Sequence, residues 1–346
     1  MKTKDTKGNL SSRLLILIFV MALTATVLIF TFISFACNPQ PPTARENVVL
    51  GVYTGDQSLL IWMAESRGYF REEGLDVTLK EFDTGAAAAK AMLRGEVEVA
   101  TCSGFAAVNN IFSDSSIRLI SCINEYHPPL LIARRDHGIQ NPVDLRNKKI
   151  AVPKGSSSEF FLGKILLLNK LTLSDVQIVY LQPAPLSEAL IQGEVDAAVI
   201  WDPLAYDLKG ALGKNGVVFL PPVGIYDYFL LITDDAILNT RPGALESLLR
   251  ALYKAEDFIR KNPEKAQTIT AERLKLQMVY VQYIWTRTTY TLSLPQILLL
   301  RMEDEARWMI QNKLTDKTAV PNYLNNIYMG GLLKVNPKAV SIIRRR

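Results

Sequence analysis

Apolar runs alternate with helix-like patterns from residue 48 onward. Short apolar runs at residues 48–53, 76–82 and 97–101 predict strands, and the segments 58–69 and 86–94 between them carry apolar residues at helical spacing. Strands that alternate with helices are typical of βαβ units, in which the strands form a mostly parallel sheet. We therefore expect an α/β fold.

The same order of elements occurs a second time. Strands are predicted at 149–152, 176–181 and 197–201, with helices at 160–170 and 186–192. The sequence itself also repeats: residues 91–100 (AMLRGEVEVA) align with residues 189–198 (ALIQGEVDAA). In each copy a glycine follows the helix and a buried strand begins about three residues later. Any corner between a helix and a strand can look like this, but the matching element order favours two similar lobes.

The rest of the chain is predicted to be helical, at 244–261, 263–276, 278–288 and 295–311. Pro242, Pro263 and Pro295 lie where the first turns of such helices would be, a position that proline tolerates well.

The N-terminus predicts contact with a membrane. Residues 14–36 are 23 uncharged, mostly apolar residues that follow a basic tail, and Cys37 comes directly after them. This length is enough to span a bilayer and exceeds the roughly 7–15 apolar residues in the h-region of an ordinary secretory signal. The segment 34–37 resembles a bacterial lipobox, in which the cysteine is acylated. Lipidation at Cys37 and a retained anchor are both open, and either places the rest of the chain outside the cytoplasm.

Composition excludes several functions. The formal net charge of +5 comes from the two ends, because residues 14–333 carry about −3, so no nucleic-acid partner is expected. Three cysteines and two histidines are too few and too scattered for a metal site, and no cofactor motif is found. Cys102 and Cys122 each lie in an apolar, strand-like run, which favours two separate buried thiols over a disulfide.

Candidate ligand contacts lie in the loops that follow the predicted strands. In open parallel sheets, ligands bind at the carboxyl ends of the strands, near the unpaired N–H groups of helix N-termini. This rule selects Thr54, Asp56, Gln57, Cys102, Ser103, Ser156, Ser157, Trp201, Asp202 and Tyr226.

Two of these loops allow a structural as well as a functional interpretation. Ser156 and Glu159 have the spacing of a capping box, which stabilises a helix whether or not a ligand binds. Asp202 could cap a helix that begins at Pro203, or it could accept a hydrogen bond from a ligand beside Trp201. No catalytic residue is predicted, because a serine or cysteine nucleophile needs a base, and the two histidines, His127 and His137, are expected in a hinge region and in a surface turn.

Four segments, 68–77, 95–100, 144–156 and 189–203, carry a resemblance to a known family. They are similar to the substrate-binding proteins of ABC transporters for nitrate, sulfonates, taurine and the pyrimidine precursor of thiamine, over most of residues 48–340.

The resemblance implies a type II periplasmic-binding fold. Residues 1–37 would be the signal peptide or anchor and 38–46 a linker, lobe one would comprise 47–130 plus 225–346, and lobe two 131–224. The family's ligand contacts fall on residues 54–57, 102, 103, 156, 157, 201 and 202. It also implies a monomer whose partners are a small ligand and the permease and ATPase subunits.

We therefore expect an extracytoplasmic, membrane-tethered solute-binding protein without enzymatic activity. Acidic and aromatic residues in the candidate loops, with Lys154 the single base, favour a polar heterocycle or an amine over a bare anion. Nitrate and sulfonate stay open, because helix N-termini alone can hold anions. The alternatives are an enzyme of the same fold in pyrimidine-precursor biosynthesis and an extracytoplasmic sensor domain.

Overall fold

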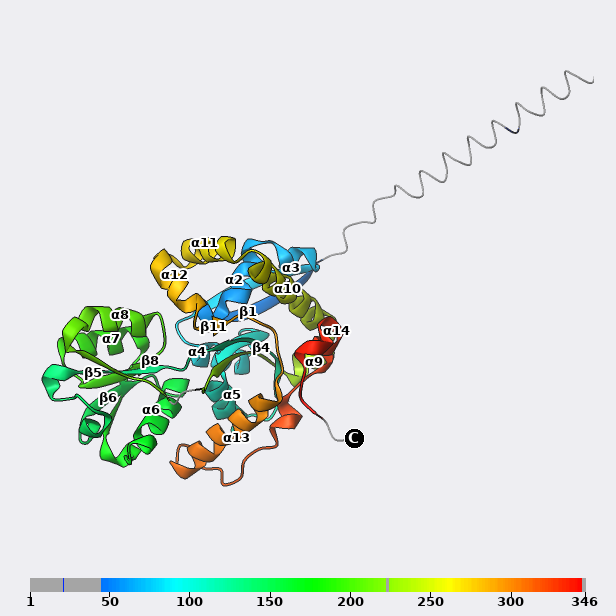
Figure 1. The fold of residues 1–346 in the computed structure, drawn as a ribbon. Coiled ribbons are helices and arrows are strands. Elements are labelled where there is room, and N and C mark those ends of the chain that lie inside the picture. Colours follow the sequence, from blue (N-terminus) through cyan, green and yellow to red (C-terminus); the bar gives the residue numbers. More distant parts are fainter. Residues whose placement is uncertain (1–20, 22–44, 222–223, 344–346) are drawn as a thin grey trace, which may run out of the picture. The chain divides into compact units, whose positions relative to one another are not determined.

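The strands assemble into two separate sheets (Figure 1). The computed structural model describes residue 21 and residues 45–221 and 224–343. The first sheet contains β1 (Glu46–Tyr53), β2 (Leu75–Phe82), β3 (Val99–Ser103), β4 (Ile117–Tyr126), β10 (Asp227–Asp234) and β11 (Thr288–Thr289). The second contains β5 (Leu130–Arg134), β6 (Lys149–Val152), β7 (Gln177–Tyr180), β8 (Ala197–Ile200) and β9 (Gly216–Phe219).

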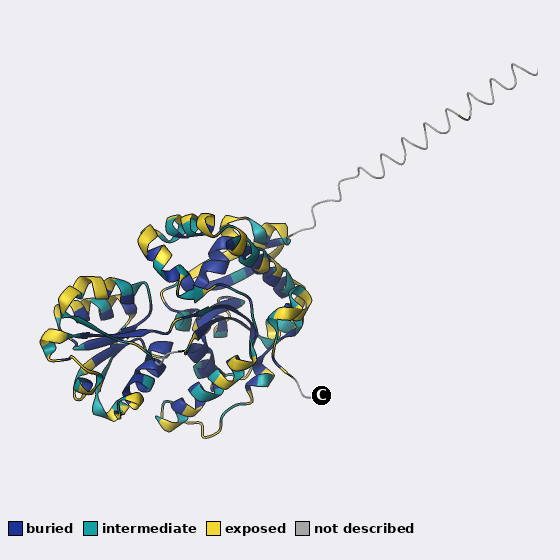
Figure 2. Cartoon of the chain, viewed as in Figure 1, coloured by how far each residue is buried: buried dark blue, intermediate teal, exposed yellow. Residues whose placement is uncertain are grey.

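Helices cover each sheet. We call the first sheet with its helices lobe one and the second sheet with its helices lobe two. The helices of lobe one are α2 (Leu59–Ser66), α3 (Tyr69–Glu72), α4 (Gly85–Leu93), α5 (Gly104–Ile111), α9 (Asp235–Thr240), α10 (Pro242–Lys261), α11 (Pro263–Leu274), α12 (Met278–Trp285), α13 (Gln296–Gln311) and α14 (Gly330–Val335). Those of lobe two are α6 (Ser157–Leu168), α7 (Pro183–Gln192) and α8 (Leu204–Leu212). Figure 2 shows the strands buried and the exposed residues on the outer helix faces.

The predicted α/β architecture with two similar lobes is confirmed. In lobe one β1 pairs in parallel with β2 and β3, and in lobe two β6 pairs in parallel with β7 and β8. Gly95 and Gly193, at corresponding places in the repeat, both adopt positive φ angles of 71° and 80°. The backbone hydrogen bonds at these helix ends also correspond, from Glu96 to Ala91 at 3.0 Å and from Glu194 to Ala189 at 2.9 Å.

The chain passes between the lobes twice, after β4 and after β9. The strand after each crossing, β5 or β10, runs antiparallel to its neighbours: β5 lies between β8 and β9, and β10 lies between β3 and β4. The parallel strands β1, β3, β6 and β8 therefore point their carboxyl ends at the region between the lobes, where ligands bind in folds of this kind.

An apolar contact joins the lobes on one side. Trp308 of α13 packs edge-on against Phe105 of lobe one and Phe160 of lobe two, with ring centroids 5.8 and 5.5 Å apart. Gly163 of α6 makes this approach possible, because a Cβ at that position would lie only 2.4 Å from the indole ring. The two helices touch where one of them has no side chain.

A more polar contact joins the lobes on another side. There Tyr206 of α8 packs against Tyr280 and Tyr283 of α12, with ring centroids 5.1 and 5.0 Å apart. Asp202, just before α8, lies 3.6 Å from the guanidinium of Arg287, just after α12. The C-terminal helices of lobe one thus contact lobe two both through α12 and through α13.

The predicted membrane segment and Cys37 lie outside the described residues, apart from Met21. In the part of the chain that is described, no helix is long and apolar enough to cross a bilayer.

The packing of α6 against α13 predicts that Gly163→Ala destabilises the closed lobes. The added methyl group would overlap the Trp308 ring, and overpacking of this kind costs about 1–3 kcal/mol. Equilibrium urea unfolding of the full chain measures this loss. Gly210→Ala is the matched control, because a Cβ at this exposed position on α8 meets nothing within 4 Å, and we expect no loss there. Equal stability changes in the two variants would refute the close packing.

Candidate ligand-binding site

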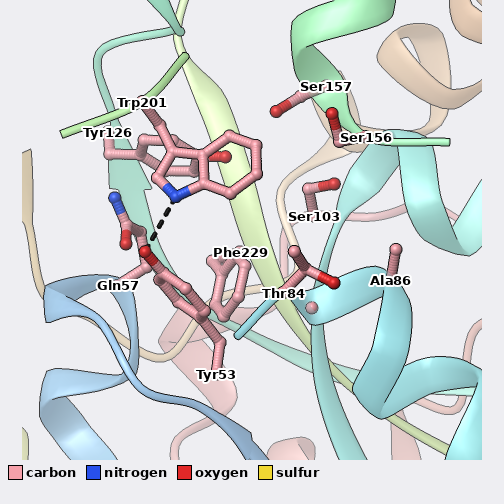
Figure 3. A pocket seen from close by; sticks show the side chains of 11 residues that line it. Tyr53, Gln57, Thr84, Ala86, Ser103, Tyr126, Ser156, Ser157, Trp201 and Phe229 are labelled. Atoms are coloured by element: carbon pink, nitrogen blue, oxygen red, sulfur yellow. Dashed lines mark hydrogen bonds between the residues drawn. The ribbon is translucent and has the colours of Figure 1, made fainter. Parts of the chain in front are cut away.

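A small pocket lies between the lobes at the carboxyl ends of the parallel strands (Figure 3). Its lining residues lie at or just after the carboxyl ends of β1, β2, β3, β4, β6 and β8, apart from Phe229 near the start of β10: Tyr53, Gln57, Thr84, Gly85, Ala86, Ser103, Tyr126, Ser156, Ser157, Trp201 and Phe229. The enclosed volume is about 30 Å³, which holds one or two water molecules. A solute of several heavy atoms needs more room, so the pocket must widen by movement of its side chains or of the lobes when one binds.

The N-termini of α4, α5 and α6 all reach this pocket. Thr84 caps α4, where its hydroxyl accepts from the Ala87 N–H at 3.1 Å, and Ser103 caps α5 by accepting from the Ala106 N–H at 3.3 Å. Ser156 precedes α6 without a side-chain cap. The first N–H groups of a helix lack intrahelical partners and carry partial positive charge. Three such ends beside one pocket favour an acceptor-rich, anionic group on the ligand.

The predicted capping box at α6 is wrong. The hydroxyl of Ser156 donates to the Pro153 carbonyl at 2.6 Å, so it does not accept from the helix. The Glu159 carboxylate accepts instead from the Gly155 N–H at 3.0 Å and from the Tyr180 hydroxyl at 2.5 Å. The helix start itself was predicted within three residues, and its N-terminus stays free to meet a ligand.

Aromatic side chains form another part of the pocket wall. The indole N–H of Trp201, in lobe two, donates to the hydroxyl of Tyr53, in lobe one, at 2.7 Å. The two rings meet edge-on with centroids 6.2 Å apart, and Phe229 packs against Tyr53 at 5.8 Å. Figure 3 shows this hydrogen bond on one side of the pocket, with Ser103 and Ala86 on the other. In the closed form, therefore, the two lobes satisfy each other's polar atoms where a ligand would bind.

Five of the residues predicted from the sequence line this pocket: Gln57, Ser103, Ser156, Ser157 and Trp201. Their contact with a ligand stays a prediction. Sequence reasoning missed the loop from Thr84 to Ala86, although it also follows a parallel strand and the strand-end rule could have found it. Gly85 lies close to the next strand, since a Cβ there would be 2.7 Å from the Cys102 Cα.

Two predicted residues lie beside the pocket without lining it. Cys102 is completely buried and, since side chains alternate along a strand, it faces away where Ser103 faces the pocket. Burial raises the pKa of its thiol, and both Cys102 and Cys122 are free, as predicted. Tyr226 is 40% exposed, and its ring packs against His127 at 5.3 Å.

Thr54 and Asp56 line a separate cavity of about 360 Å³ that also touches the starts of α7 and α8. Asp56 is buried, and one of its carboxylate oxygens, Oδ1, has no hydrogen-bond partner among the described residues. Burial raises the pKa of Asp56 to about 8, and the nearby Asp202 carboxylate adds to the rise. Burial also raises the pKa of Asp202, which the Arg287 guanidinium partly offsets. The predicted acids thus lie together behind Tyr53 and not in the pocket wall.

Comparisons with known proteins identify a family and several relatives of this chain. A family model described as NMT1/THI5 like matches residues 56–266. Among relatives, the taurine-binding periplasmic protein of Escherichia coli strain K12 is 24% identical over 250 residues, which cover 71% of this chain and 71% of that protein.

Solved structures share the fold. The alkanesulfonate-binding protein SsuA of Xanthomonas axonopodis pv. citri, bound to MOPS, has a TM-score of 0.72 at 17% identity, with 83% of this chain and 100% of that chain covered. The desulfurization enzyme DSZB has a TM-score of 0.55 at 16% identity, with 84% and 99% covered. At these identities the structures show a shared fold and no more.

The burial of Asp56 predicts a pH-dependent stability. An unfolded chain loses this proton near pH 4, whereas the folded chain keeps it until about pH 8, so ionisation favours unfolding as the pH rises between these values. We expect Asp56→Asn to stabilise the protein, and its advantage over the parent to grow by about 2–4 kcal/mol between pH 5 and pH 8. Urea unfolding across this range measures the difference.

Asp144→Asn is a control of opposite sign. Backbone N–H groups of Gln140 and Asn141 lower the pKa of Asp144, so its carboxylate stabilises the fold above the ordinary carboxyl range. This variant should be less stable than the parent by an amount that stays constant between pH 5 and pH 8, because the difference builds up only below the ordinary carboxyl pKa of about 4. A pH profile of Asp56→Asn parallel to that of the parent would show that Asp56 is not held protonated.

Proposed function

The chain belongs to the NMT1/THI5-like family, and from this membership we propose that it is the solute-binding component of an ABC importer. It captures a small solute between two lobes and delivers it to permease and ATPase subunits. The observation that carries the proposal is the pocket between the lobes, to which both halves of the internal repeat contribute strand ends and helix N-termini. Hinged closure of two lobes around a ligand is a general property of periplasmic binding proteins.

The ligand is a small solute with a sulfonate-type oxyanion. The N-termini of three helices meet at the pocket, and the residues that line it include hydroxyl groups and no carboxylate. The sequence argument favoured an amine or a heterocycle because it counted Asp56 and Asp202 as ligand contacts. Neither residue lines the pocket, so an oxyanion is now favoured. The names of a taurine-binding relative and of a structural neighbour that binds alkanesulfonates support the same class.

An enzyme of the same fold is the second candidate, because the desulfurization enzyme DSZB shares the architecture. The described side chains favour binding. His127 packs against Tyr226, and His137 bonds to Asp196 at 2.7 Å, so neither histidine lines the pocket. The Cys102 thiol is buried beneath the pocket with a raised pKa, and a thiol in that state is a poor nucleophile.

The same proposal includes a location and an oligomeric state for the protein. It acts as a monomer on the outer face of the cytoplasmic membrane, held there by the N-terminal segment or by a lipid on Cys37. The taurine-binding relative is named as periplasmic, which supports an extracytoplasmic location. A sensor domain would instead need a partner protein that binds selectively to the ligand-bound form.

Titration of the full chain, purified in mild detergent, with taurine, alkanesulfonates and nitrate tests the function. We expect at least one sulfonate to bind, measured by calorimetry, and to raise the melting temperature. A ligand present at 100 times its Kd stabilises the folded state by about 2.7 kcal/mol. If none of these anions binds or shifts the melting temperature, the proposed function is wrong.

Blocking variants locate the binding. Ala86 lines the pocket, whereas Ala87, the next residue of α4 and equally half-buried, does not. Ala86→Leu fills the pocket and should weaken sulfonate binding at least tenfold, while Ala87→Leu should leave the Kd within about twofold. Equal Kd values for the two variants would place the ligand elsewhere.

A further inference from the structure

A second cavity lies between the lobes and shares Tyr53 with the pocket. Its volume of about 360 Å³ falls within the range of about 300–1,000 Å³ that is usual for small-molecule sites. Lobe one contributes residues 54–56, Asp83, Leu274 and Leu276, and lobe two contributes the starts of α7 and α8. A molecule bound in this cavity would therefore touch both lobes without entering the pocket.

Asp56 supplies the cavity with a buried acceptor that has no donor. The residue is 2% exposed, it lines the cavity, and its Oδ1 has no hydrogen-bond partner among the described residues. The guanidinium of Arg287 lies beside Asp202 instead, at 3.6 Å, and within the described part of the chain Asp56 forms no ion pair. A buried acceptor without a donor is unfavourable, so a ligand that brings a donor to this oxygen gains binding free energy.

The rest of the cavity wall is acidic or apolar. Asp83, which is exposed, adds a second carboxylate, and no lysine or arginine is found among the described residues that line the cavity. Most of the remaining wall consists of proline and leucine side chains: Pro183, Pro185, Pro203, Leu204, Leu274 and Leu276. Two carboxylates without a nearby cation repel an oxyanion and attract a cation, and the apolar wall suits an alkyl chain attached to it.

We propose that this cavity is a second ligand site, which binds a small aliphatic ammonium or guanidinium ion and is separate from the pocket for the solute. The charged nitrogen donates to Asp56 Oδ1, and the alkyl chain lies against the proline and leucine side chains. Hydrogen bonds between a cation and a carboxylate are among the strong ones in proteins. Because both lobes form the cavity, the bound cation stabilises the contact between them. This inference goes beyond the proposed function and does not depend on which solute the pocket takes.

Calorimetric titration of the full chain, purified in mild detergent, with n-butylammonium, 1,4-butanediammonium and butylguanidinium tests this site. At pH 8 we expect at least one of these cations to bind saturably. The neutral alcohol 1-butanol, which has the same chain without the charge, should bind at least tenfold more weakly. If none of the three cations binds, the inference is wrong.

Asp56→Asn should weaken binding of that cation at least tenfold. Loss of the buried carboxylate is expected to stabilise the fold, so unfolding would not explain weaker binding. Asp144→Asn is the matched control, because Asp144 of lobe two does not line the cavity, and its Kd should stay within about twofold of that of the parent. Equal Kd values for Asp56→Asn and the parent would overturn the inference.

A blocking variant locates the cation without a change of charge. Ala184, in the first turn of α7, lines the cavity, and Ala184→Phe should fill part of it and weaken binding at least tenfold. Gln192→Phe adds the same ring at the other end of α7, outside the cavity, and should leave the Kd unchanged. Equal binding by these two variants would place the cation elsewhere and contradict the inference.

Proton release checks the contact with Asp56 in the parent chain. Asp202 of lobe two and the hydroxyls of Tyr53, Tyr280 and Tyr290 face this carboxyl group, and burial raises the pKa of each tyrosine, so the hydroxyls stay neutral in the range tested. Burial raises the pKa of Asp56 to about 8. A cation that binds the ionised form should therefore release about one proton at pH 7 and much less at pH 9.

Calorimetry in buffers of different ionisation enthalpy measures this release. Binding at pH 7 without proton release would contradict the contact. The proposed function is judged separately by the titrations with sulfonates and nitrate, because those anions would enter the pocket and not this cavity. Failure of the cations alone leaves the proposed function standing, and failure of both sets of ligands shows that both are wrong.

Discussion

The two passages of the chain between the lobes constrain everything else in this structure. Each passage places an antiparallel strand beside the parallel ones, β5 in lobe two and β10 in lobe one. Tyr126 and Asp227, at the ends of the two passages in lobe one, are register partners and share a hydrogen bond of 2.7 Å. Tyr126 also lines the pocket. One of the residues at which the chain passes between the lobes, Tyr126, is thus also part of the pocket wall, so the pocket and the connection between the lobes share a side chain.

Buried acids lie on two sides of the pocket. Asp56 and Asp202 lie on one side of the pocket, and Asp227 and Glu305 on another, while the cations near them are the partly exposed Arg287 and Arg301. Burial raises the pKa of every one of these carboxyl groups, so the packed structure favours their neutral forms. Ionisation of Asp56 or Asp202, which face each other from the two lobes, therefore opposes the contact between the lobes.

Much of this fold could be predicted from the sequence because the βαβ units are local. The repeat at residues 91–100 and 189–198 forms the same helix-to-strand corner twice, down to the positive φ at each glycine. Antiparallel β10 was not predicted as a strand, because an all-buried strand lacks alternation and its partners, β3 and β4, lie more than a hundred residues away. The expected helix at 58–69 is two helices, since Gly68 adopts a positive φ between α2 and α3.

The site was harder to predict because the strand-end rule gives a loop and not the direction of each side chain. Ser103 faces the pocket and Cys102 the core, a difference of one strand position. Glu303, Asp304 and Glu305 form an acidic run on α13 that a sequence interpretation assigns to solvent. In the structure Glu303 does lie at the surface, but Asp304 pairs with Lys164 of lobe two and Glu305 is buried. Helical geometry points the three side chains in different directions, and only the packing of α13 against α5 and α6 decides which one is buried.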